Sequence, residues 1–139
     1  MSYKLDEVLG ELKSLRLTLP VAQYLPSDEV INGYESEIGF VFPDDYRAFL
    51  KEASDSMLNG KDALRITPER NHPRELCVAL EEARKAGIPP DWLPICEDNG
   101  NYFCLTPDQS IRFWNHDGVS DESWPNLATW IKEVWIEEN

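Results

Sequence analysis

The sequence predicts an α+β fold, with an antiparallel sheet that forms a meander in the C-terminal half and helices packed against it before and after. The strongest observation is residues 92–118, which have the pattern of three consecutive short strands. Asn99-Gly100 separates the first two, and this pair tolerates the positive φ that a type I′ hairpin turn requires of both central residues. Pro107-Asp108 supplies the next turn. Apolar residues at helical spacing on both sides of the strands supply the helices.

Three helices are expected before the first strand. Apolar residues from Leu5 to Leu15 recur every three or four positions and predict a helix that stops before Pro20. Ser27 can cap a second helix, and Gly39 can end it. Pro43 opens the third helix. The apolar stripe of this third helix is Tyr46, Phe49, Leu50 and Ala53.

Apart from the meander, one strand and two further helices are expected after residue 58. Asn59-Gly60 marks a turn into a strand near residues 63–66. A helix starts at Pro73 and ends at Gly87. The last helix opens at Ser123-Trp124-Pro125, and its apolar residues recur at helical spacing: Leu127, Trp130, Ile131, Val134 and Trp135.

The chain is strongly acidic. Its 139 residues include 26 acidic and 13 basic side chains, which gives a formal net charge of −13, and residues 97–139 hold nine acidic and two basic residues. This charge opposes binding to nucleic acid or to an anionic membrane and favours a basic partner. The longest uncharged run, residues 17–27, contains two prolines and is too short to span a bilayer or to form a signal-peptide core. We therefore expect a cytoplasmic protein.

The three cysteines, Cys77, Cys96 and Cys104, form the odd and sparse set typical of a reducing compartment. With a two-residue loop at Asn99-Gly100, Cys96 faces Phe103 across the hairpin and Cys104 faces Ile95. Adjacent strand positions point to opposite faces, so the two hairpin thiols should not meet. All three cysteines are expected to be reduced and to share no metal ion.

Two groups of segments resemble the SUKH superfamily of the Smi/Knr type. Glu37-Ile38-Gly39 and the Phe-Pro-Asp-Asp-Tyr-Arg-Ala-Phe-Leu run at residues 42–50 resemble the family's glutamate, glycine and LPxDYxxFL segments. Leu93-Pro94-Ile95, residues 100–105 and residues 114–117 resemble its LPIA, GDxxxLD and WDHD segments. The resemblance covers residues 28–135. It implies one compact α+β domain at residues 27–139, preceded by a helical extension and connector at residues 1–26.

The resemblance also implies a function. Bacterial SUKH members are mostly immunity proteins that bind and neutralise toxin domains of contact-dependent or polymorphic toxins, whereas fungal relatives are regulatory and scaffolding proteins. A toxin that cuts nucleic acid presents basic residues to phosphates, and an acidic protein suits such a surface. We expect a non-enzymatic immunity protein without a cofactor, whose partner is a basic toxin domain. The alternative is an intracellular regulator or scaffold that binds endogenous proteins.

The candidate partner-binding residues gather in the sequence around the meander. The acidic ones follow or flank the predicted strands, and the tryptophan lies outside the best positions of the last apolar stripe. They are Glu97, Asp98, Asp108, Asp117, Asp121, Glu122 and Trp124.

Two other patterns have simpler structural explanations. His116-Asp117 could serve as a general-base pair for Cys104 or Ser120, but no nucleophile motif surrounds either residue, so we interpret it as a strand-end turn and expect no catalytic residue. The oxygen-rich residues 97–101 lack the spacing of a calcium loop, and hairpin chemistry explains them without a metal ion.

Overall fold

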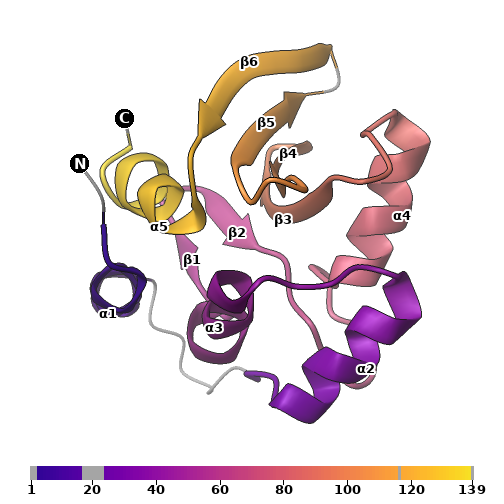
Figure 1. Cartoon of the computed structure of the whole chain (residues 1–139), viewed down its shortest axis with the longest axis horizontal. Coiled ribbons are helices and arrows are strands. Elements are labelled where there is room, and N and C mark those ends of the chain that lie inside the picture. The colour runs from indigo at the N-terminus through magenta and orange to yellow at the C-terminus, as the bar shows by residue number, and fades with distance from the viewer. Residues whose placement is uncertain (1–2, 17–23, 116, 139) are drawn as a thin grey trace.

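The computed structural model describes residues 3–16, 24–115 and 117–138, and the structural statements below concern these residues. The helices are α1 (Leu5–Leu15), α2 (Asp28–Ile38), α3 (Asp44–Ala53), α4 (Leu76–Ala86) and α5 (Leu127–Trp130), which continues into the π-helical segment η1 (Ile131–Ile136). The strands are β1 (Met57–Leu58), β2 (Lys61–Ala63), β3 (Leu93–Asp98), β4 (Asn101–Leu105), β5 (Ile111–Asn115) and β6 (Gly118–Trp124). They form one antiparallel sheet in sequential order, which confirms the predicted α+β fold (Figure 1).

The first three helices lie where the sequence predicts them. The Ser27 hydroxyl accepts a hydrogen bond from the backbone N–H of Val30 at 3.4 Å, and Gly39 ends α2 with a left-handed φ of 77°. Such a φ favours glycine because it lacks a Cβ atom. Pro43 stands directly before α3.

The main core lies between the sheet and the helices α1, α3 and α5 with η1. In Figure 1, α1, α3 and α5 surround β1 and β2, and α4 lies on the other side of the fold, beyond β3. All five apolar positions predicted for the last helix are buried, although its second half is π-helical. The rings of Trp130 and Trp135 pack at a centroid distance of 5.4 Å. This stripe therefore closes the core at the C-terminal end of the chain.

A smaller apolar cluster fills the opposite face of the sheet. It consists of Cys104 and Trp114 from the strands and of Ala83 and Ile88 from α4 and the residues after it. The sheet thus has apolar residues on both faces, and α4 covers the second face over β4 and β5.

A buried carboxylate fixes the loop that leads into α4. Glu75 accepts hydrogen bonds from the backbone N–H of Thr67 at 3.0 Å, from the Thr67 hydroxyl at 2.5 Å and from the Tyr34 hydroxyl at 3.1 Å. A buried carboxylate needs such donors because its desolvation is otherwise costly. Glu75 therefore connects α2, the loop and the start of α4.

The β3–β4 hairpin has the predicted turn and a partly corrected register. Asn99 and Gly100 have φ values of 54° and 85°, and Cys96 pairs with Phe103 as predicted. The expected pairing of Cys104 with Ile95 is wrong, because a bulge shifts the register there and Cys104 pairs with Pro94. The Ile95 carbonyl accepts a hydrogen bond from Leu64 at 3.0 Å.

The thiols of Cys96 and Cys104 lie apart despite this register shift. Cys96 belongs to the main core and Cys104 to the smaller cluster, so the two lie on opposite faces of the sheet. All three cysteines are free.

Two element boundaries in the middle of the chain differ from the predictions. The strand expected near residues 63–66 pairs at residues 61–63, and Arg65 then donates its backbone N–H to the carbonyl of Arg74 at 2.8 Å. The helix expected from Pro73 begins at Leu76, whose N–H donates to the Arg65 carbonyl at 2.7 Å. These two hydrogen bonds keep the backbone before Leu76 extended, so the helix begins at Leu76 and not at Pro73.

The segment after residue 117 also differs from the prediction. The expected helix opening at Ser123-Trp124-Pro125 is wrong, because Ser123 and Trp124 end β6 and the Asn126 side chain caps α5 by accepting from Thr129 N–H at 2.8 Å. β6 has a polar sequence without the alternation that identifies a strand. A polar strand of this kind suits the edge of a sheet.

Candidate partner-binding surface

Three of the predicted acidic residues lie along the free edge of the sheet. Asp121 and Glu122 are exposed on β6, which is an edge strand, and exposed Asp117 lies in the turn before it. None of these three carboxylates forms an ion pair with another described residue. This edge of the sheet is therefore negatively charged and open to solvent; we call Asp117, Asp121 and Glu122 the acidic edge.

The acidic edge is shaped by a bulge. Arg112 pairs with Ser123 and Trp114 pairs with Val119, so residues 120–122 of β6 lie opposite Phe113 alone. The Ser120 hydroxyl accepts from the backbone N–H of Glu122 at 3.0 Å. Bulges of this kind occur at sheet edges, where they bend the strand away from regular pairing.

The other candidate acids are divided between the two ends of the sheet. The antiparallel registers place Asp117 and the turns at residues 59–60 and 99–100 at one end of the sheet and the turn at residues 106–110 at the other. Glu97 and Asp98 therefore share an end of the sheet with Asp117, but β4 and β5 lie between them, about 14 Å in total at the usual strand spacing. Asp108 lies at the opposite end.

The Asp108 carboxylate is engaged in its own turn. It accepts from the Thr106 hydroxyl at 2.5 Å, the Ser110 hydroxyl at 2.7 Å and the Ser110 N–H at 3.1 Å. The hydrogen bonds from Thr106 and Ser110 lower the pKa of this carboxyl to about 2. These contacts make Asp108 a turn-stabilising residue.

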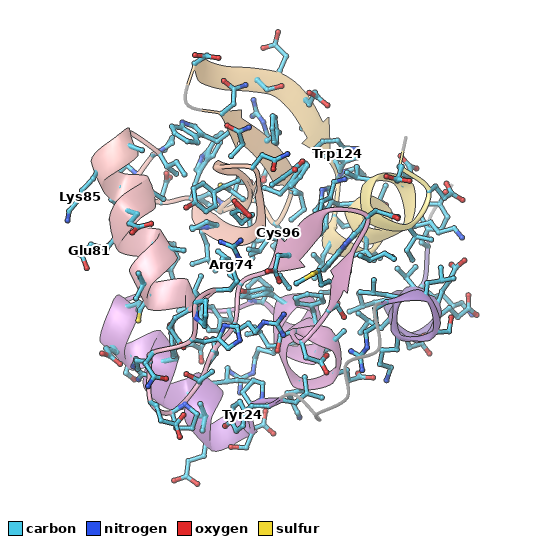
Figure 2. The ribbon with its side chains drawn as sticks, turned by 180° about the vertical axis from the view of Figure 1, so that it is seen from behind. Tyr24, Arg74, Glu81, Lys85, Cys96 and Trp124 are labelled. Carbon is cyan, nitrogen blue, oxygen red and sulfur yellow. The ribbon has the colours of Figure 1, made fainter. Side chains whose placement is uncertain are left out.

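Glu97 and Trp124 also have structural contacts. Glu97 accepts from Gly100 N–H at 2.8 Å and lies 3.5 Å from Arg74. Trp124 is half-buried at the end of β6 near α5 (Figure 2), with its ring 5.8 Å from that of Phe103. Asp98 is partly exposed and has no ion pair among the described residues.

The structure describes only some of the residues that a catalytic His116-Asp117 pair would involve. His116 lies outside the described residues. Burial raises the pKa of the Cys104 thiol, which disfavours a reactive thiolate. The Nδ1 atom of His72 accepts from the backbone N–H of Arg74 at 2.9 Å, so this ring stabilises the loop before α4.

The described residues offer neither a metal site nor a membrane-spanning helix. No group of three His, Cys, Asp or Glu side chains within residues 3–16, 24–115 and 117–138 is placed to hold a metal ion. None of the helices in those ranges has the length and apolar character needed to cross a bilayer.

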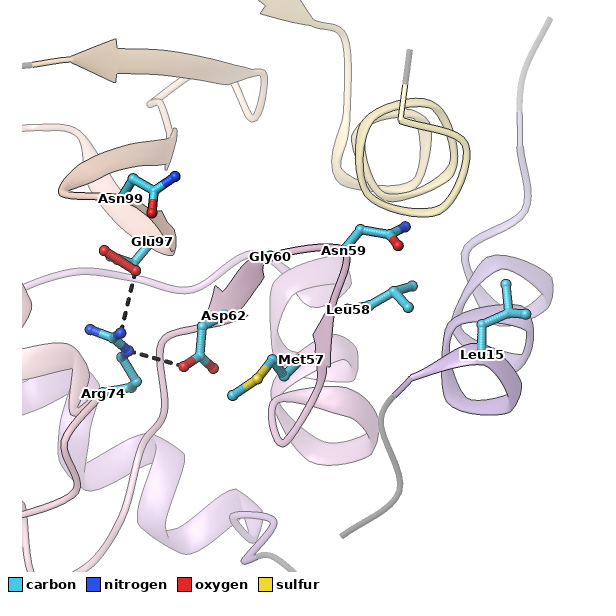
Figure 3. Close-up of a pocket in the computed structure, with 9 residues that line it drawn as sticks. All are labelled: Leu15, Met57, Leu58, Asn59, Gly60, Asp62, Arg74, Glu97 and Asn99. Atoms are coloured by element: carbon cyan, nitrogen blue, oxygen red, sulfur yellow. Dashed lines mark hydrogen bonds and ion pairs between the residues drawn. The ribbon is translucent and has the colours of Figure 1, made fainter.

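A groove that no sequence pattern predicts opens beside β1 (Figure 3), with a volume of about 460 Å³. Its apolar side is formed by Leu15, Met57 and Leu58, and its polar side by Asp62, Arg74 and Glu97. Asn59, Gly60 and Asn99 line it at the two turns. The Arg74 Nε atom donates to Asp62 at 3.0 Å. The only sequence signal at this place is the pair of Asn-Gly turns.

Comparison with known proteins identifies the family. The sequence model of the SUKH_5 family, described as SMI1-KNR4 cell-wall, matches residues 5–136. The chain belongs to this SUKH family. A crystal structure of a protein from Pseudomonas syringae pv. tomato is similar, with a TM-score of 0.86 and 26% identity over 95% of this chain and 98% of that one. No curated protein matches the sequence.

The family-like segments of this SUKH chain lie in its framework. Residues 42–50 lead into and form most of α3, and residues 93–95 and 100–105 lie in the β3–β4 hairpin. Glu37, at the end of α2, forms an ion pair with Arg70. These segments contribute to turns, core and helix ends, whereas the acidic edge and the groove lie mostly outside them.

Proposed function

We propose that this protein is an immunity protein that binds a toxin domain stoichiometrically and blocks the toxin's active site or substrate surface. Membership of the SUKH family is consistent with such a role. On this proposal the protein acts by binding and not by catalysis, and the partner is a basic protein domain such as a nuclease.

The observation that carries the proposal is the acidic edge. Three exposed carboxylates that form no ion pair with a described residue attract a basic surface at long range and accelerate its association. The bulge and the charges also protect β6 from pairing with another copy of the strand. Its exposed groups are therefore suited to a charged partner more than to self-association.

Coexpression tests the proposal. The protein is produced together with the C-terminal domain of a large exported protein encoded beside it, in a bacterium that lacks both genes, and growth is measured. Rescue of growth by the wild type, with a one-to-one complex on size-exclusion chromatography, supports the proposal. Absence of rescue and of a complex overturns it.

A second candidate is a regulatory or scaffold protein that binds endogenous partners. The words "cell-wall" in the description of the matching family favour it. It predicts a growth or envelope defect when the gene is deleted in the absence of any toxin, whereas the immunity proposal predicts normal growth in that case.

A further inference from the structure

The groove beside β1 is a part of one face of the sheet that none of the described helices covers. Four residues form consecutive cross-strand pairs on this face, namely Met57, Asp62, Glu97 and Tyr102. Tyr102 packs against the smaller apolar cluster that α4 covers. Met57, Asp62 and Glu97 line the groove instead, so the row passes from a covered region into an open one.

In the groove, exposed apolar side chains lie close to acidic side chains. Leu15 and Met57 are 50% and 37% exposed, which is unusual for large apolar side chains in this fold. Figure 3 shows Leu15 and Leu58 on one side of the groove and the Asp62–Arg74–Glu97 chain on the other. A side chain with an aliphatic stem and a cationic head matches both sides at once.

The charges favour a cation over an anion. Asp62 is paired from its buried side by Arg65 at 3.1 Å and from the groove by Arg74 at 3.0 Å. The Oε1 atom of Glu97 lies 3.5 Å from a guanidinium nitrogen of Arg74. Because this ion pair is long, the carboxylate can bind a second cation.

We propose that this groove receives an extended segment of the protein partner in which a lysine or arginine stands beside an aliphatic residue. The aliphatic groups contact Leu15, Met57 and Leu58, and the cationic head lies near the Glu97 carboxylate. The inference rests on the proposed function, because it gives the basic toxin domain a specific anchor next to the turns that share an end of the sheet with Asp117.

Methyl NMR can test the groove without the toxin. The chain has two methionines, so labelling with ¹³C-methyl methionine gives two signals, and a Met57→Leu variant assigns the one in the groove. The probes are three N-acetylated, C-amidated peptides: Ala-Leu-Arg-Leu-Ala, Ala-Leu-Glu-Leu-Ala and Ala-Ser-Arg-Ser-Ala. We expect a saturable shift of the Met57 signal with the first peptide only.

Variants locate the binding. Leu15→Ser should weaken the first peptide about tenfold, because it removes exposed apolar surface that the peptide would cover. Val78→Ser is the matched control, since Val78 is 47% exposed on α4 and does not line the groove, and it should leave binding unchanged. Glu97→Gln should weaken binding about twofold to fivefold, the range expected of a solvent-accessible ion pair.

Four results would overturn the inference. A Met57 signal that does not move with any peptide means that the groove takes no such segment. Equal shifts with the arginine and glutamate peptides mean that no cation is selected, and equal shifts with the leucine and serine peptides mean that the apolar side has no role. If coexpression shows protection by the wild type and equal protection by Leu15→Ser, the groove inference fails while the proposed function stands.

Discussion

Two buried tyrosines allow a direct test of how the core is stabilised. The Tyr46 hydroxyl is fully buried and has no hydrogen-bond partner among the described residues. The Tyr34 hydroxyl is buried as well, but it accepts from Cys77 N–H at 2.5 Å and donates to Glu75 at 3.1 Å. Replacing each tyrosine by phenylalanine removes the same oxygen from two different environments.

The two variants should change stability in opposite directions. Tyr46→Phe removes an unsatisfied polar group and should raise the free energy of unfolding by about 1 kcal/mol. Tyr34→Phe leaves the partly buried N–H of Cys77 without its acceptor and removes one donor from a buried carboxylate, which should lower the same quantity by about 2 kcal/mol. In a domain of this size these values correspond to a melting temperature about 3 °C higher and about 6 °C lower, respectively.

Thermal unfolding followed by circular dichroism, with urea titration for the free energies, measures both variants against the wild type. The ring of Tyr34 keeps its contact with the Arg70 guanidinium, 4.3 Å from the ring centroid, in the phenylalanine variant, so the comparison isolates the hydroxyl. A Tyr46→Phe variant destabilised as much as Tyr34→Phe would refute the reasoning, because it would show that the Tyr46 hydroxyl is hydrogen-bonded.

Three further predictions concern local features. The folded-state pKa of Asp108 is about 2, below its ordinary value of 3.8. The ionised carboxylate therefore stabilises the fold above about pH 4, and this contribution is lost as the pH falls toward 2. Calorimetry should find Asp108→Ala less stable than the wild type at pH 7, with a smaller difference at low pH. Thiol titration of denatured protein purified without reductant should count all three cysteines as free, and a Cys96–Cys104 disulfide in mass spectrometry would contradict the structure. Asn126→Ala should lower stability by about 1 kcal/mol and Ser27→Ala by less, because the cap hydrogen bonds measure 2.8 and 3.4 Å, and equal urea midpoints for the two variants would count against this.

Features set by neighbouring residues could be predicted from the sequence. Asn99-Gly100 specifies its turn because few other residue pairs adopt two successive positive φ angles. The ends of α2 follow in the same way from Ser27 and Gly39, and the last apolar stripe identifies which residues enter the core. Each of these signals lies within about ten residues of the chain.

Features set by distant residues could not be predicted. The strand β3 has a bulge at Ile95. The Ile95 carbonyl accepts a hydrogen bond from the backbone N–H of Leu64, which is distant in the sequence. The groove joins Leu15 at the end of α1 to Met57 on β1, and no local pattern connects the two. β6 carries no apolar alternation because its edge position allows polar residues on the exposed side.

The candidate site could be predicted only in part, because its geometry also depends on residues that are distant in the sequence. An aspartate beside a proline has the same sequence signal whether its carboxylate faces a partner or accepts hydrogen bonds in its own turn, as Asp108 does. Asp117, Asp121 and Glu122 are exposed as expected, and their clustering depends on the strand that the sequence did not reveal. Whether these residues bind a partner stays a prediction.

The most direct test of the proposed function is the rate at which the toxin domain associates with this protein. Stopped-flow measurements compare the wild type with a variant carrying Asp117→Lys, Asp121→Lys and Glu122→Lys, after circular dichroism has shown that both are folded. Electrostatic steering is screened over about 10 Å at 0.1 M salt, so the wild-type rate should fall about tenfold or more as salt rises, and the variant should associate slowly at every salt concentration. Equal rates and a flat salt response in the folded variant would contradict the account, because they would mean that the acidic edge does not face the toxin.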